Sequence, residues 1–238
     1  MTGTLINVAA VLAGTGMGAL LGARLPDRIR ETVMYGLGLF VLVLGIAQGL
    51  EAFRPPLTDL TRGAALIILG SVLVGGVLGE LLRIEGGLDR AGEALRQRFG
   101  RDQPGFTEGF VVASLVFCVG PLTILGSIQD GLTGDYQLLA IKSLLDGFAA
   151  LAFASALGWG VGFSVITILV YQGGLSLSAS ALAGAFSDAM IAAMSAVGGV
   201  LILGIGLRLL ALREVRVANL LPALVLAPAT VAVLEAMR

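Results

Sequence analysis

The sequence predicts an all-α polytopic membrane protein with about eight transmembrane helices, seven being the alternative count. Hydrophobic residues make up 57% of the 238 residues and charged residues only 13%, against roughly 25% charged residues in a soluble domain. Mean hydropathy is +0.97, and the uncharged stretches approach the roughly 20 apolar residues that a helix needs to cross a bilayer. The 35 glycines are spread through these stretches, so we expect them to belong to the membrane architecture.

Eight segments are apolar and long enough to serve as spans, in chain order 3–23, 32–50, 63–80, 109–128, 137–157, 160–176, 187–208 and 217–235. Three of them leave the count open. One contains Lys142 and Asp146, one is short, and one opens with Asp188. Apolar length alone is therefore compatible with six, seven or eight crossings.

The distribution of arginine favours eight crossings, because cytoplasmic loops of membrane proteins are enriched in Lys and Arg. With eight spans, 11 arginines fall on one side and 3 on the other, whereas removing one of the later spans gives 8 against 6. We therefore expect a protein of the bacterial inner membrane with both termini outside. The loops 24–31, 81–106 and 208–216 are expected in the cytoplasm.

The loop 81–106, between the third and fourth spans, is expected to contain a short amphipathic helix on the cytoplasmic membrane surface. Its apolar residues recur at helical spacing among charged ones, at Leu88, Ala91, Leu95 and Phe99. A regulatory or partner-binding helix is the alternative. We expect residues 1–238 to form a single transmembrane domain in the lipid bilayer.

Composition excludes several kinds of site. The absence of histidine removes imidazole metal ligands and His-dependent catalysis, and a single cysteine, Cys118, excludes an internal disulfide and a cysteine-based metal cluster. A net charge of −1 gives no basic surface for nucleic acid, and no G-x-x-x-x-G-K-[ST] motif occurs. We expect no cofactor and no nucleic-acid partner, and the sequence leaves other metal binding undetermined.

Asp146 lies about ten residues into the segment 137–157, near the middle of the bilayer at ~1.5 Å rise per residue. Lys142 is one turn earlier on the same helix face, and Ser143 lies between them. A charge at the bilayer centre costs roughly 2.5–3.5 kcal/mol on insertion scales, so intramembrane charges are functional candidates. The two charges can simply neutralise each other, or they can serve a transport path.

Gly120 and Pro121 stand in the middle of the segment 109–128. Proline removes a backbone donor, which leaves the carbonyl of Phe117 without its helical partner. Freed carbonyls in broken membrane helices are a recurrent cation site in transporters. A packing kink without a ligand is the alternative interpretation.

Polar side chains also occur near the predicted outer ends of several spans, where we expect them to belong to the ion pathway and its entrance. These residues are Asn7, Gln129, Asp130, Gln172 and Asp188. The predicted outer side carries six acidic residues against three arginines. Such a surface attracts cations and repels anions.

Part of the chain is consistent with internal helix-pair repeats. The stretch GFVVASLVFCVGPL, from Gly109, aligns without a gap with GFSVITILVYQGGL, from Gly162, at an offset of 53 residues. Repeats are common in transporters, which place the substrate at the repeat interface. The alternative is chance similarity between two segments rich in Gly, Leu and Val.

Three stretches carry a resemblance to a known family: GTLINVAAVLAG, LPDRIRETVMYGLGLFVLVLGI and CVGPLTILGSIQDGLTGDYQLLAIKSLLDGFAALAFASALGWGV. Over its whole length the chain resembles the bacterial membrane family called domain of unknown function 554. The resemblance implies a multi-pass inner-membrane protein, described as a candidate transport protein. It assigns no substrate and no site residue.

We therefore expect a secondary, ATP-independent transporter or a channel for a small ion or solute, cationic in view of Asp146, and not an enzyme. A non-catalytic assembly subunit is the first alternative, and an intramembrane aspartyl enzyme, which requires two carboxylates that share a proton, is the second. Close-packing glycine pairs favour tight helix contacts, within one chain or in a homo-oligomer. These pairs are Gly14/Gly18/Gly22, Gly45/Gly49, Gly75/Gly79 and Gly158/Gly162.

Overall fold

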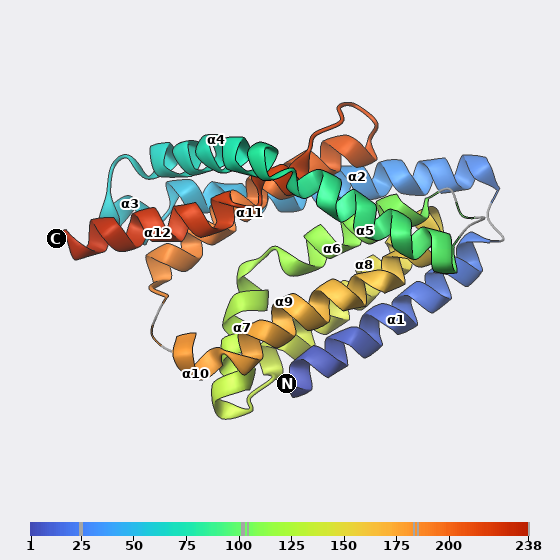
Figure 1. Ribbon diagram of the computed structural model, residues 1–238, viewed down its shortest axis with the longest axis horizontal. Helices are drawn as coiled ribbons and strands as arrows, with labels where there is room; N and C mark the ends of the chain where they lie inside the picture. The colour runs from blue at the N-terminus through green and yellow to red at the C-terminus, as the bar shows by residue number, and fades with distance from the viewer. Residues whose placement is uncertain (24–25, 101–102, 104, 183, 185, 238) are drawn as a thin grey trace. The chain divides into compact units, whose positions relative to one another are not determined.

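The computed structural model describes residues 1–238 except 24, 25, 101, 102, 104, 183, 185 and 238, and the described part is helical without a strand (Figure 1). Parts of the predicted cytoplasmic loops 24–31 and 81–106 thus lie outside the described residues. The α-helices are α1 (Thr2–Gly22), α2 (Asp27–Gly49), α3 (Leu57–Leu60), α4 (Ala64–Leu82), α5 (Ile84–Phe99), α6 (Phe106–Cys118), α7 (Pro121–Thr133), α8 (Gln137–Leu157), α9 (Val165–Leu177), α10 (Ala179–Leu182), α11 (Asp188–Leu209) and α12 (Ala223–Ala236). Three 3-10 helices join them, η1 (Leu50–Phe53), η2 (Gly158–Ser164) and η3 (Val217–Leu220).

Internal contacts group the chain into two compact units, each assembled from two stretches of sequence. The first unit comprises Met1–Leu37 and Leu88–Ala183, and the second comprises Gly38–Gly87 and Gly184–Arg238. Lys142, Ser143 and Asp146 fall in the first unit. The two units are therefore described separately.

The polytopic membrane fold is confirmed. Among the described residues, six helices are long and apolar enough to cross a membrane, and seven if the bent pair of α6 and α7 counts as one span. The predicted eight exceeds this count because Gln137–Leu177, a continuous helical run of 41 residues, is counted once. At ~1.5 Å per residue such a run is about twice as long as the ~30 Å hydrocarbon core.

The 41-residue run reverses direction within the first unit. Helix α8 packs parallel to α1, since Gly14 faces Gly147 and Gly22 faces Ser155. Helix α9 packs antiparallel to α1, because Gly162 of η2 lies against Thr15 whereas Gln172 bonds to Asn7. The chain turns at Gly158, whose φ of +80° favours glycine. The run therefore has two antiparallel arms, as the prediction of eight crossings requires.

The glycines of α1 allow its backbone to approach that of α8 (Figure 1). A Cβ atom added at Gly14, Gly18 or Gly22 would lie 2.1–2.3 Å from a carbonyl oxygen of α8. The three oxygens belong to residues that are also spaced by four, Gly147, Leu151 and Ser155. Residues spaced by four on α1 therefore pack against residues spaced by four on α8. This is the close packing that small-xxx-small pairs permit.

The second unit uses glycine in the same way. Gly45 and Gly49 of α2 face Gly199 of α11, and Gly79 of α4 faces the backbone of Asn219. The sequence left open whether such glycine pairs join helices within one chain or between copies. The structure shows these glycines in contacts within one chain.

The predicted amphipathic helix of the loop 81–106 is confirmed as α5, which ends at Phe99. Its Phe99 ring stands 5.2 Å from that of Phe163 of η2. Arg96 pairs with Glu93 one turn earlier at 2.7 Å, and this guanidinium holds the pKa of the Glu93 carboxyl at about 2. The ring contact joins the C-terminal end of α5 to the first unit, whereas the Glu93–Arg96 pair lies within α5 itself.

The predicted break in the fourth span is also confirmed. Helix α6 ends at Cys118, α7 begins at Pro121, and the two axes differ by 65°. Gly120 between them has a φ of +149°, which an L side chain rarely adopts. Helix α6 lies beside α9, where Ser114 and Thr167, which occupy equivalent places of the predicted repeat, share a hydrogen bond of 2.9 Å.

Candidate functional site

An ion pair lies inside the first unit at mid-height of α8. Lys142 and Asp146 are 6% and 8% exposed, and the ammonium of Lys142 donates to Oδ2 of Asp146. The helical period places the two side chains on one face, as the sequence predicts. An isolated charge would be expensive at such a site, so each neutralises the other.

Asn7 of α1 joins this pair to a third helix. Its side chain is fully buried, and its amide nitrogen Nδ2 donates to Oδ2 of Asp146 and to Oε1 of Gln172, each at 3.0 Å. The amide oxygen Oδ1 of Asn7 has no hydrogen-bond partner among the described residues. A buried acceptor without a partner is uncommon and marks a place where a ligand or water can bind.

Gln172 of α9 completes the arrangement, because its Nε2 donates to the hydroxyl of Thr4 at 3.3 Å. We call Thr4, Asn7, Lys142, Asp146 and Gln172 the polar cluster. Its members come from α1, α8 and α9. Sequence reasoning missed Thr4, although its spacing of three residues from Asn7 places both on one face of α1.

The broken helix lies beside the polar cluster. Cys118, the last residue of α6, is within electrostatic range of both Lys142 and Asp146. The carbonyl of Phe117, predicted to lose its partner, accepts a bond of 3.4 Å from the hydroxyl of Thr123. The break therefore places the end of α6 near the buried charges, and the freed Phe117 carbonyl is satisfied by a side-chain hydroxyl.

Other predicted site residues have different partners. The hydroxyl of Ser143 donates to its own helix at the Leu139 carbonyl, at 2.6 Å, and Gln129 donates to Asp135 at 2.8 Å. Asp188 is exposed in the first turn of α11, in the second unit. The structure thus brings Asn7 and Gln172 to the ion pair, and it leaves Ser143, Gln129 and Asp188 out of the polar cluster.

Asp130 of α7 is buried, and it lies beside the start of α1. One of its oxygens, Oδ2, accepts from the Gly3 amide at 3.1 Å and pairs with the amino group of Met1 at 2.8 Å. A carboxylate at this point complements the positive end of the helix. Its other oxygen, Oδ1, has no partner among the described residues.

Buried polar side chains occur both on α1 and on the antiparallel arm formed by η2 and α9, at the polar cluster and beyond it. We call this set the polar seam. It consists of Thr4, Asn7 and Thr15 on α1 and of Ser164, Gln172 and Ser176 on the opposite arm. Within the described residues, four of them have an oxygen without a hydrogen-bond partner, namely Asn7, Thr15, Ser164 and Ser176. Polar surfaces of this kind are what water and ions need inside a bilayer.

Two apolar residues interrupt the polar seam. Val11 lies between Asn7 and Thr15 on one face of α1, and Ile168 lies between Gln172 and Ser164 on the other arm. Both side chains are fully buried. We call Val11 and Ile168 the apolar layer. Along the two segments, this layer stands between the polar cluster on one side and Thr15 and Ser164 on the other.

The largest charged network of the second unit is structural. Glu85 is buried, and its carboxylate accepts from Arg208 at 3.0 Å and from the Ala218 amide at 2.7 Å. Its own amide donates to Asn219 at 2.8 Å. Both carboxylate oxygens have partners, so this network joins the start of α5 to η3 and α11. Sequence reasoning missed it, because Glu85 reads as one of many charges in a polar loop.

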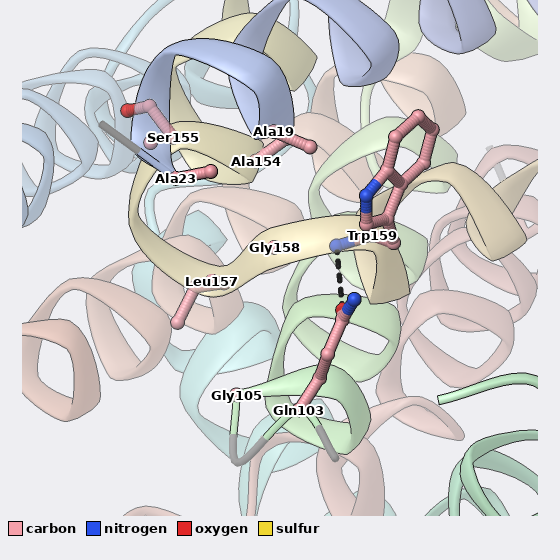
Figure 2. A pocket seen from close by; sticks show the side chains of 10 residues that line it. Ala19, Ala23, Gln103, Gly105, Ala154, Ser155, Leu157, Gly158 and Trp159 are labelled. Atoms are coloured by element: carbon pink, nitrogen blue, oxygen red, sulfur yellow. Dashed lines mark hydrogen bonds between the residues drawn. The ribbon is translucent and has the colours of Figure 1, made fainter. Parts of the chain in front are cut away.

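A cavity of about 250 Å³ lies at the opposite end of the α1–α8 contact from Thr4 (Figure 2). Its walls are mainly small residues such as Ala19 and Ala154, with Trp159 beside them. Oε1 of Gln103 accepts from the amide of Trp159 at 3.3 Å. No side chain among its described lining residues is charged, so the polar cluster is the stronger candidate site. Among the described residues, no group of three or more acidic or cysteine side chains gathers as a metal site.

Comparison with known proteins decides the family. Residues 2–232 match the family described as "Protein of unknown function (DUF554)". The chain belongs to this family. It is similar to the "Uncharacterized membrane protein YdfK" of Bacillus subtilis (strain 168), at 30% identity over 236 residues, which cover 99% of this chain and 98% of the relative.

A second relative of this DUF554 protein is the "Uncharacterized protein YqgA" of Escherichia coli (strain K12). The two are 35% identical over 230 residues, which cover 94% of each chain. No solved structure matches the chain. The comparisons confirm the family resemblance, and a relative named a membrane protein agrees with the several apolar helices of a multi-pass membrane protein.

Proposed function

We propose that the protein is a secondary, ATP-independent transporter or channel for a small cation, with its pathway through the first unit. The observation that carries the proposal is the polar cluster, in which one carboxylate and one ammonium are buried at mid-height of α8 beside an unpartnered amide oxygen. Intramembrane charges of this kind are costly and typically mark an ion path. We further propose that the protein resides in the bacterial inner membrane with both termini outside.

In this proposal Asp146 is the cation-binding group and Lys142 its exchangeable partner. While the carboxylate is paired with the ammonium, the polar cluster has no net charge. A cation that binds Asp146 takes over this role, and the flexible Lys142 side chain moves away until its ammonium reaches water. The exchange avoids an uncompensated buried charge, whose cost reaches about 3–5 kcal/mol.

The polar seam supplies the route by which the cation reaches Asp146 and leaves it. Its hydroxyl and amide oxygens replace part of the water that a cation loses on leaving solution. Val11 and Ile168 form the barrier, because an apolar constriction excludes water and therefore ions. The Gly120 break gives α6 and α7 a point about which to move.

The test is flux through purified protein in proteoliposomes, with Na⁺, Rb⁺ and protons measured separately. We expect Asp146→Asn to lower flux of the transported cation by about tenfold or more, the factor that ~1.4 kcal/mol of lost site stabilisation gives. Asp146→Glu keeps the charge and is expected to retain part of the flux. Full flux in the Asp146→Asn protein would sink the proposal.

Asp135→Asn is the matched control, since it makes the same chemical change in the same unit. Asp135 lies outside the polar cluster and accepts from Gln129. We expect its flux to equal that of the unmodified protein. Size-exclusion profiles of all three variants separate loss of flux from loss of folding.

A further inference from the structure

We infer that the polar cluster binds a monovalent metal cation of the size of Na⁺, held by three side-chain oxygens once the amide of Asn7 has turned over. The inference rests on the proposed function, because it names the substrate class of the same site. Its starting point is the orphan acceptor Oδ1 of Asn7, on a side chain that is fully buried.

Two of the three oxygens already lie next to the side-chain amide of Asn7. Nδ2 of Asn7 lies 3.0 Å from Oδ2 of Asp146 and 3.0 Å from Oε1 of Gln172. The two ends of an amide have nearly the same shape, so rotation by about half a turn exchanges nitrogen and oxygen at that position. Oδ1 of Asn7 then adjoins Oδ2 of Asp146 and Oε1 of Gln172.

These three oxygens are of the kind that a hard cation binds. Carboxylate and amide oxygens are the ligands that hard metal ions prefer, and softer metals select sulfur or imidazole. Gln172 is held in the orientation this requires, because its Nε2 donates to Thr4 and its Oε1 points to Asn7. Only Asn7 has to change its orientation.

Charge selects a monovalent ion. The polar cluster contains one carboxylate, and Lys142 supplies the single positive charge that balances it. Once the Lys142 ammonium has moved out to water, one bound monovalent cation restores neutrality at Asp146, whereas a divalent cation would leave a net positive charge away from water, which is costly. A proton would satisfy Asp146 and would make no use of the two amide oxygens.

Lys142 then acts as a tethered competitor for the cation site. A group that fills a site most of the time lowers the apparent affinity of a ligand by the fraction of time the site is open. Removal of the ammonium by Lys142→Met is therefore expected to tighten Na⁺ binding by about tenfold or more.

The test is equilibrium binding of radiolabelled Na⁺ to purified protein in detergent, which needs no transport. We expect saturable binding in the unmodified protein, tighter binding in Lys142→Met, and loss of binding in Asn7→Leu and Gln172→Leu. Gln137→Leu is the matched control, because Gln137 is an exposed glutamine at the start of α8. Its binding should be unchanged.

Asn7→Asp separates a ligand role from a structural one. It keeps an oxygen at the site and adds a second carboxylate, so we expect Ca²⁺, which prefers several carboxylate ligands, to compete with Na⁺ in this variant and not in the unmodified protein. A residue that only holds the fold would not produce this change of ion preference.

Two results would overturn the inference: no saturable Na⁺ binding in Lys142→Met, or unchanged Na⁺ binding in a folded Asn7→Leu protein. Asp146-dependent flux of protons without Na⁺ binding would leave the transport proposal standing and remove this one. Na⁺ binding without flux of any cation would support the site and count against transport.

Discussion

At the scale of single residues, the first unit buries an ammonium and a carboxylate and surrounds them with neutral polar groups. Asp146 accepts from both Lys142 and Asn7, whereas Oδ1 of Asn7 lacks a partner among the described residues. A pair that served only stability would be satisfied on every side, as Glu85 is in the second unit. The incomplete satisfaction of Asn7 is the feature on which the proposed binding site rests.

Glycine positions allow a prediction at the same scale. We expect Gly18→Ala to destabilise the protein by about 1–3 kcal/mol or more, because the added Cβ would lie 2.1 Å from the Leu151 carbonyl oxygen. Gly16→Ala, two residues away on the same helix, adds a methyl group where no atom lies within 4 Å. Thermal unfolding of the solubilised proteins should separate the two, and equal midpoints would refute the packing of α1 on α8.

Some of these residues could be predicted from sequence. Lys142 and Asp146 are one turn apart, so the helical period alone predicts that they can pair. The partnership of Asp146 with Asn7 and Gln172 could not be predicted, because these residues are 139 and 26 positions away and meet only through the packing of three helices. Periodicity gives the face of a helix and does not give the neighbour that covers it.

At the scale of elements, the arm formed by η2 and α9 lies along α1 with polar residues at two levels and an apolar layer between them. We expect Val11→Ser to raise cation leak about tenfold, as a barrier lower by ~1.4 kcal/mol would give. A hydroxyl in the apolar layer allows water to bridge the levels of Asn7 and Thr15. Efflux from proteoliposomes without a counter-gradient measures the leak.

Ala9→Ser serves as the control for this leak, because it adds the same hydroxyl on the exposed face of α1. Its efflux should match the unmodified protein. If both variants leak equally, the hydroxyl acts on general stability and the apolar layer is not the barrier.

Among the interruptions between helices, those caused by a particular residue type could be placed from the sequence. Proline at 121 forces the end of α6, and Gly158 with its positive φ turns the chain between α8 and α9. The short helices α3 and α10 were not predicted. Each has four residues, too few to show a helical period, and such turns depend on their packing.

At the scale of the whole molecule, the number of crossings sets the side on which each loop lies. In the eight-crossing arrangement Ser178 lies outside, whereas a single crossing by Gln137–Leu177 would place it in the cytoplasm. We expect a membrane-impermeant maleimide to label Ser178→Cys in intact cells. Gly87→Cys on α5 should react only after permeabilisation. Both variants carry Cys118→Ala, which removes the native cysteine.

Cells that express Cys118→Ala alone are the control and should give no signal. Labelling of Ser178→Cys only in permeabilised cells would rule out eight crossings with an outside N-terminus. Labelling of Gly87→Cys in intact cells would reverse the orientation of the whole protein.

The hydrogen bond between Ser114 and Thr167 has a consequence for the history of this chain. The two residues are 53 positions apart, and each occupies the sixth place of its copy of the aligned stretch. Identical segments that associate side by side make this like-to-like contact about a twofold axis. The contact is therefore the one expected if the two stretches descend from a single segment that once paired with its own copy.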